Sequence, residues 1–208
     1  ISTTDDSGGT SLLIGSNQYY SGGSISRFTT SRSGSAIDFG YTGTMKFYTG
    51  SGTAAPSEAM RIDSVGSVGI GTTPSTWAST VYDALQIGGS IGVGTIAGRV
   101  DGINQVNFGL NWNYDGGATL TYVGASFATN YAQEAGTHRW SHAASGTAGG
   151  ALTFTESMRI DASGNVGIGT SLPDGKLHIQ DGSAGTVTAA AGANDLVIET
   201  SQTSGMSI

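Results

Sequence analysis

A thirteen-residue phrase occurs twice in this chain, and it constrains the fold more than any other feature. Residues 60–72 read MRIDSVGSVGIGT, and residues 158–170 read MRIDASGNVGIGT, 98 positions later. The phrase alternates apolar residues with glycine, and catalysis rarely needs two copies of such a pattern. A period of 98 residues is too long for the usual solenoid repeats, so each unit is expected to contain several strands.

The phrase itself predicts a β-hairpin. In an extended chain Met158 and Ile160 share one face, while Arg159 and Asp161 share the other. Asp161 suits the first position of a type I turn, and Gly164 suits the fourth. The second strand then alternates Val166 and Ile168 with Gly167 and Gly169. The matching residues of the first copy are Met60, Arg61, Ile62, Asp63, Val68 and Ile70.

The glycines leave one face of this second strand without side chains. Glycine weakens a strand by roughly 0.5–1 kcal/mol, so it is usually kept where another backbone comes close. We therefore expect the phrase to form a structural joint in which neighbouring chains pack tightly around an axis. A glycine-rich loop within a single chain is the alternative.

Composition favours an all-β fold. The 208 residues include 35 glycines, and only 11% are charged, yet aromatic and β-branched residues recur in short runs between the glycines. The best helix start is at Thr73 and Pro74, where one or two turns are expected.

Charge and cysteine content exclude several classes of function. The net charge is −7, and the eight basic residues are scattered, so neither nucleic acid nor membrane insertion is expected. The absence of cysteine excludes disulfides and thiolate metal sites. No signal peptide or apolar run of about 20 residues is present. Stability is expected from packing or from association with other chains.

The phrase also predicts how the chain is divided. A first β module covers residues 1–74, a second covers 75–173, and tail strands cover 174–208. Both modules end in the repeated hairpin. The echo DALQIGGS (83–90) follows the first copy, and GKLHIQDGS (175–183) follows the second. Because the last residues stop inside an alternating pattern, we expect a further C-terminal region after them.

The clearest long strand lies in the second module. Its apolar face is predicted to carry Val106, Phe108, Leu110, Trp112 and Tyr114, before a turn at residues 115–117. The opposite face carries several amides, which suit sugar hydroxyls, and a nearby aromatic ring suits a sugar face. The candidate glycan-binding residues are Asn107, Asn111, Asn113 and Tyr131. A merely solvated hairpin face is the alternative.

Three further clusters have structural and chemical interpretations. Arg61 with Asp63, and Arg159 with Asp161, are interpreted as structural ion pairs rather than a substrate clamp. His138, Trp140 and His142 share a strand face and would line an axial metal site if three chains met, but ordinary strand packing is preferred. Asp115 and Glu134 are the acid pair that a glycosidase would need, but both positions are typical of turns and loops. No metal, cofactor or catalytic residue is therefore assigned.

The repeated phrase resembles a segment that recurs in bacteriophage tail fibres and related virion appendage proteins. The resemblance extends to SGTAGGALTFTES before the second copy, SLPDGKLHI after it, TTPSTWASTVYDALQIGG, LNWNYDGG and ANDLVIETSQTSGMSI. It covers most of residues 45–208. Many such fibres end in a self-cleaving intramolecular chaperone, which would follow residue 208. The first copy departs from the fuller pattern at Val65 and Ser67.

The resemblance implies an elongated homotrimeric fibre of intertwined β segments. It also implies an extracellular location on the virion, contact with other tail or fibre proteins, and attachment to host cell-surface glycans through repeated weak sites. A polysaccharide-cleaving tailspike and a cellular surface filament remain the alternatives.

Overall fold

The chain is all-β. The computed structural model describes residues 2–5, 10–21, 24–27, 33–51, 54–77, 81–89, 93–115, 119–182 and 195–200, and these contain strands but no helix. Fifteen strands form one sheet: β1 (Ser2–Asp5), β2 (Thr10–Ser16), β5 (Ser35–Phe39), β6 (Met45–Thr49), β7 (Ser57–Ile62), β8 (Val68–Ile70), β9 (Tyr82–Ile87), β10 (Gly94–Arg99), β11 (Gln105–Leu110), β14 (Ala128–Glu134), β15 (Thr137–Ala143), β17 (Thr155–Ile160), β18 (Val166–Ile168), β19 (Leu177–Asp181) and β20 (Leu196–Thr200).

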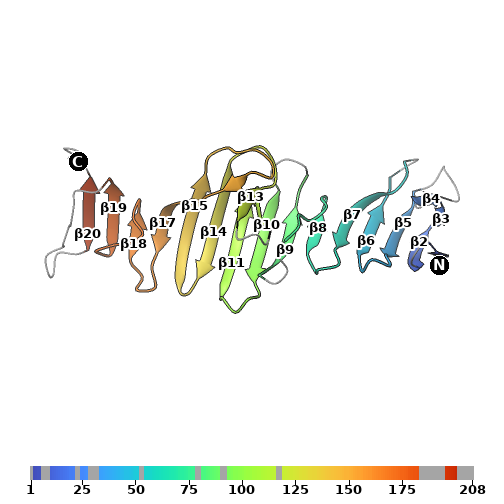
Figure 1. Ribbon diagram of the computed structural model, residues 1–208, viewed down its shortest axis with the longest axis horizontal. Helices are drawn as coiled ribbons and strands as arrows, with labels where there is room; N and C mark the ends of the chain where they lie inside the picture. The colour runs from blue at the N-terminus through green and yellow to red at the C-terminus, as the bar shows by residue number, and fades with distance from the viewer. Residues whose placement is uncertain are drawn as a thin grey trace.

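The large sheet gives the molecule its elongated shape. Neighbours in the sheet follow chain order, and the strands lie across the long axis, with β1 and β20 as its two outer strands (Figure 1). Fifteen strands at a spacing of about 4.8 Å span roughly 70 Å. Most neighbours are antiparallel, whereas β8–β9, β18–β19 and β19–β20 are parallel. The all-β character agrees with the sequence-based expectation.

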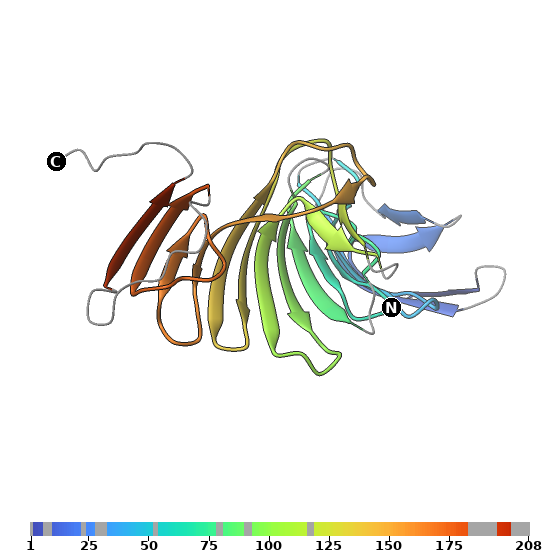
Figure 2. The ribbon, with the colours of Figure 1, turned by 60° about the vertical axis from the view of Figure 1, so that its left-hand side comes forward.

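Two small sheets accompany the large one. Strands β12 (Trp112–Tyr114), β13 (Leu120–Tyr122) and β16 (Ala151–Leu152) form the first, and β3 (Gln18–Ser21) pairs with β4 (Ser24–Arg27) in the second. Figure 2 shows the first of them lying against one side of the curved large sheet. The main core lies beneath it and comprises Trp77, Tyr82, Ala84, Ala97, Trp112, Tyr122, Ala128, Ala143 and Leu152.

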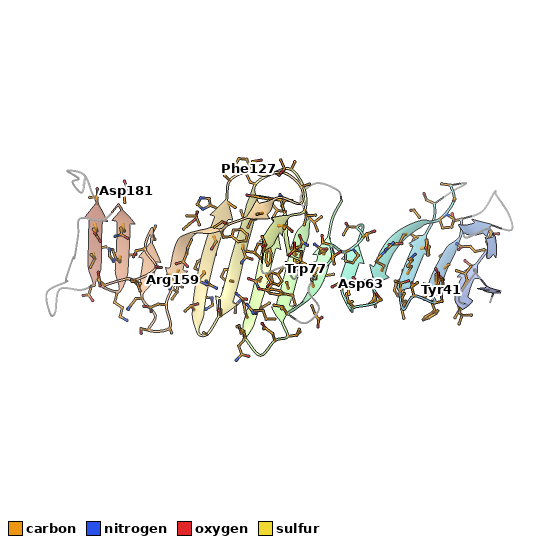
Figure 3. All side chains as sticks on the ribbon, viewed as in Figure 1. Tyr41, Asp63, Trp77, Phe127, Arg159 and Asp181 are labelled. Carbon is orange, nitrogen blue, oxygen red and sulfur yellow. The ribbon has the colours of Figure 1, made fainter. Side chains whose placement is uncertain are left out.

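Aromatic edge-to-face contacts fill this core. The Trp77 and Trp112 ring centroids lie 5.4 Å apart, and Phe154 lies 5.9 Å from Trp112. Trp77 is labelled in the crowded middle of the molecule in Figure 3. Small alanines of the large sheet leave room for these rings. The face of the large sheet that receives the small sheet is called the covered face below, and the other is the apolar face.

The predicted strand from Gln105 to Tyr114 is interrupted at Asn111. This residue has φ of 64°, in the left-handed region that asparagine tolerates better than most residues, and it separates β11 from β12. Trp112 therefore turns into the core beneath the small sheet, so the prediction that it shares a face with Phe108 is wrong. Strands β12 and β13 still pair antiparallel as expected, while residues 116 and 117 of the predicted turn lie outside the described residues.

Replacing Asn111 with alanine is expected to cost about 3 kcal/mol in unfolding free energy, because it removes several buried hydrogen bonds. Its fully buried amide donates to the carbonyls of Gly124, Ser126 and Phe127, and its oxygen accepts from the Gly124 amide at 2.6 Å. Urea denaturation measures the loss. Asn113→Ala is the comparison, since its amide makes two hydrogen bonds with the described residues. Equal or negligible losses in the two variants would contradict the role of Asn111.

The short helix expected at Thr73 and Pro74 is wrong, since residues 71–77 contain none. This segment must return across the sheet so that β9 can run parallel to β8. Buried Pro74 lies over Gly69, where an added Cβ would come within 2.7 Å of the proline Cδ. The Ser75 amide donates to the Gln86 side chain at 2.6 Å. These contacts hold the connection in an extended path.

The large sheet continues through both copies of the phrase without interruption. The predicted module boundaries, after residues 74 and 173, fall in the two connections that lead into parallel strands. Of the predicted tail, β19 and β20 are described, and residues 183–194 and 201–208 lie outside the described residues. The division into modules stays a prediction.

Candidate functional site

The two copies of the phrase form hairpins with the same register. In β7–β8, Met60 pairs with Ile70 and Ile62 with Val68; in β17–β18, Met158 pairs with Ile168 and Ile160 with Val166. After each hairpin, the similar segment noted in the sequence forms a parallel strand, β9 after the first copy and β19 after the second. The two parallel pairs, β8–β9 and β18–β19, have the same register. The hairpin prediction is confirmed, and the two copies flank the central region, as Asp63 and Arg159 mark in Figure 3.

The aspartate of the phrase shapes the turn. The amide of Gly164 donates to the Asp161 carbonyl at 2.9 Å, and Gly164 has φ of 78°. The Asp161 carboxylate accepts hydrogen bonds from the backbone amides of Asn165 and Ser163 at 2.8 and 2.9 Å. These bonds lower the pKa of the Asp161 carboxyl, and the bond from Asn165 has the larger effect. Asp63 accepts the equivalent pair of amides in the first copy.

The predicted pairing of the phrase's arginine with its aspartate is corrected by the structure. Arg159 forms a bidentate ion pair with Glu156, with donor–acceptor distances of 2.5 and 2.7 Å, and Arg61 forms the same pair with Glu58. The glutamate shares the covered face because a β-bulge shifts the register between it and the methionine. The sequence does show this glutamate in both copies, because the repeat begins two residues earlier as Glu-x-Met-Arg-Ile-Asp.

The bare glycine face is explained within one chain. A Cβ at Gly167 would lie 2.5 Å from the Thr170 carbonyl oxygen, and one at Gly69 would lie 2.3 Å from that of Thr72. Gly169 has φ of 76°, and a Cβ added there would lie 2.1 Å from the Gln180 carbonyl oxygen. A backbone does come close, as predicted, but it is the chain's own next segment. The chain's own backbone is enough to account for these glycines, and packing of the phrase against neighbouring chains stays a prediction.

Each glycine face is also covered by a buried polar side chain from the following parallel strand. Gln86 pairs with Gly69 and His178 with Gly167. The His178 Nδ1 accepts from the Asp174 amide at 3.2 Å, so its Nε2 carries the proton and faces Glu199 at 3.3 Å. The two hairpins are thus complete structural units inside the chain.

The apolar face carries the most extensive unassigned feature of the described chain. From β2 to β20, one cross-strand row on this face contains only apolar or aromatic residues, and we call it the apolar ladder. Its fourteen members are Leu12, Phe39, Met45, Ile62, Val68, Leu85, Ile96, Phe108, Tyr131, Trp140, Met158, Ile168, Ile179 and Ile198. It includes the apolar residues of both copies of the phrase.

The ladder is solvent-accessible in the single chain. Ile96 is 40% exposed, Phe108 43% and Ile198 52%, and the ladder spans the large sheet from β2 to β20. Parallel rows flank it, with Ile14, Ile37, Phe47, Met60, Ile70 and Ile87 in the N-terminal half, and Ile160, Val166, Leu177 and Leu196 in the C-terminal half. A contiguous apolar surface of this extent is typical of an interface.

Aromatic rings form the middle of the ladder. Tyr131 stacks on Trp140 with centroids 5.0 Å apart, and on Phe108 at 6.1 Å. The rings cover each other's faces and leave their edges outward. Edges suit packing against apolar side chains better than stacking on sugar rings.

The four predicted glycan-binding residues do not lie together. Asn107, Asn111 and Asn113 are buried on the covered side of the molecule, where Asn111 and Asn113 hold the small sheet and Asn107 accepts from Asn130 at 2.9 Å. Tyr131 belongs to the ladder on the opposite face, and its hydroxyl lies 2.5 Å from His138 Nδ1. The solvated amide face expected from the sequence is absent from the described residues.

The structure also shows where the histidines and the two acidic residues singled out in the sequence lie. His138 and His142 lie on the apolar face beside Trp140, and His142 Nδ1 contacts the Ser157 hydroxyl at 2.7 Å. No group of three or more metal-ligating side chains occurs in the described ranges. Glu134 is held by Gln105 at 3.0 Å and by Arg139, and Asp115 follows β12 on the small sheet.

No protein-family model matches this chain, and no curated protein matches it either. The part of the chain that the structure describes contains no helix long and apolar enough to cross a membrane.

Proposed function

We propose that this chain is a structural and adhesive appendage protein that assembles as a homotrimer, of the kind found in bacteriophage tail fibres. The observation that supports this most is the apolar ladder, which runs from β2 to β20 and is open to solvent in the single chain. Strands that lie across a long axis, with one apolar face, suit assembly into a prism whose inner walls are three such faces.

The expected gain from assembly is large. Burying the exposed parts of fourteen apolar side chains contributes on the order of 10 kcal/mol per chain, before the costs of association. The number three, the virion location and the contact with other tail or fibre proteins rest on the resemblance of the repeated phrase. In this proposal the chain catalyses no reaction and acts through repeated weak contacts with host cell-surface glycans.

The solution mass of the purified chain tests this proposal. Light scattering is expected to give three times the chain mass of 20.9 kDa, independent of protein concentration across the micromolar range. A stable, soluble monomer would contradict the proposal and would favour the polysaccharide-cleaving tailspike or another function. A trimer without any virion partner would leave the cellular surface filament as the better assignment.

A further inference from the structure

The basic residues in the strands of the large sheet all lie on the covered face. The strand register places there Lys46, Arg61, Arg99, Arg139 and Arg159. From β2 to β20, the ionisable side chains that the register places on the apolar face are Asp83, Tyr131, His138, His142 and Asp181. Among the paired strand residues of this range, the two histidines are therefore the groups on the apolar face that can become positively charged.

Both histidines lie on β15, one on each side of Trp140 of the apolar ladder. His138 stacks on Tyr131 with ring centroids 6.0 Å apart, and its Nδ1 lies 2.5 Å from the Tyr131 hydroxyl. The Nδ1 of His142 lies 2.7 Å from the Ser157 hydroxyl. A hydroxyl can donate to a neutral imidazole and can accept from an imidazolium. The single chain therefore keeps both contacts in either protonation state, so protonation is not expected to unfold it.

The neighbouring strands β14 and β17 offer these rings no counter-charge. The carboxylates of these strands, Glu134 and Glu156, lie on the covered face in ion pairs with Arg139 and Arg159. The side chains of β14 and β17 that lie on the apolar face beside the histidines are Thr129, Tyr131, Gln133, Thr155, Ser157, Met158 and Ile160. A protonated histidine would therefore depend on water for its stability.

The two aspartates of the apolar face lie far from the histidines. Asp83 on β9 is four strands from β15, and Asp181 on β19 is three strands from it, or roughly 19 and 14 Å at the usual spacing. These distances exceed the Debye length of about 8 Å at physiological salt. Rotation about the long axis keeps each residue at its own height, so the aspartates of a neighbouring copy would lie at the same heights.

We propose that His138 and His142 make the assembly sensitive to acid, so that copies associate at neutral pH and separate below about pH 6. This inference rests on the proposed function, since it requires that copies associate through the apolar ladder. Association would remove both rings from water beside Trp140, and an unpaired charge is strongly disfavoured in an apolar interface. The assembly therefore requires neutral rings, whereas the single chain can bind protons. Acidification favours the single chain.

The expected effect is large. Histidine in water titrates near about pH 6.5, so a ring that must be neutral weakens association by about 30-fold per chain at about pH 5, relative to about pH 8. One such ring in each of three chains raises the concentration of half-assembly by at least about a hundredfold. Aspartate in water titrates near about pH 4, so the aspartates of the apolar face stay charged in this window.

The first copy of the repeated phrase indicates how to remove these histidines without disturbing the fold. Strand β6 precedes the first copy as β15 precedes the second, with the same register and with a bulge at the same place. Met45 and Thr49 occupy the positions of His138 and His142. His138→Met with His142→Thr therefore introduces residues that the fold already uses there. This double variant removes both titrating groups and adds no charge.

The chain's third histidine, His178, supplies the matched control. It is buried on the covered face, where it pairs with Gly167 as Gln86 pairs with Gly69 in the first copy. His178→Gln therefore removes a histidine that lies outside the proposed interface. Its pH response should match that of the natural chain.

The test is sedimentation velocity of the full chain at about pH 8 and about pH 5, at constant ionic strength and over a dilution series. A fixed urea concentration, too low to change the circular dichroism of the sheet, brings dissociation into the measured range. The natural chain and His178→Gln are expected to need at least about a hundredfold higher concentration for half-assembly at the lower pH. The double variant should change by less than about threefold.

Several results would overturn this inference. Equal assembly of the natural chain at both pH values would do so and would leave the proposed function standing. A pH response that persists in the double variant, or one that disappears in His178→Gln, would assign the effect to other groups. Loss of the strand signal at the lower pH would show that acid unfolds the chain instead of separating copies. A single chain at the higher pH and at every concentration would overturn the proposed function as well.

Discussion

Phe108→Glu is expected to abolish assembly while the chain keeps its β-sheet. Phe108 sits in the middle of the apolar ladder, between Ile96 and Tyr131, and is 43% exposed. A carboxylate there is tolerated by a solvated monomer, but it would cost several kcal/mol per chain if three copies had to be buried together. Light scattering should report the mass of one chain, and circular dichroism should still report strands.

Phe127→Glu is the matched control. Phe127 is 65% exposed but precedes β14 and lies away from the ladder. Figure 3 labels it at the ends of the central strands. The same change of residue type is expected to leave assembly intact. If both variants assemble, or both dissociate, the ladder is not the specific interface.

Gly167→Val with Gly169→Val is expected to destabilise the fold by at least about 4 kcal/mol. The first valine would collide with the Thr170 carbonyl, and the second would need φ near 76° against the Gln180 carbonyl. Because β18 joins β17 to β19, the C-terminal strands should detach, and assembly should be lost with them. Urea denaturation and hydrogen exchange of β19 amides measure the effect.

Gly98→Val is the control for this pair. Gly98 also lies inside a strand, β10, but an added Cβ would meet nothing within 4 Å there. Its substitution should change the unfolding free energy by less than about 1 kcal/mol. A double variant in the phrase that is as stable as this control would contradict the close approach at Gly167 and Gly169.

Local patterns in the sequence predicted the hairpins well. Asp161 and Gly164 suit particular turn positions, and Val166 and Ile168 alternate with glycine, so the turn and both faces follow from neighbouring residues alone. The all-β class follows in the same way. The partner of Arg159 was missed because a bulge brings Glu156 onto its face, and a strict two-residue alternation cannot show a bulge.

Features that depend on distant contacts were not predicted. Asn111 looks like one more residue of an alternating strand, but its side chain bonds three carbonyls between Gly124 and Phe127 and turns Trp112 into the core. Predicting the ladder requires the register of every strand pair, and this register cannot be deduced from any single strand. The recess between the large sheet and the small sheet likewise combines residues from β9, β11, β12, β13, β14 and β15 with the segment before β17.

The most direct test of the account is the reactivity of a single cysteine on the ladder. The natural sequence has no cysteine, so Ile168→Cys and Leu172→Cys each introduce one thiol in the same region. In a single chain the exposures of 39% and 79% predict rates within a few-fold of each other. We predict that a soluble maleimide modifies position 168 at least tenfold more slowly than position 172 in the native assembly, and that this difference falls to a few-fold after dissociation. Equal rates in the native protein would show that the ladder stays open to water and would contradict the account.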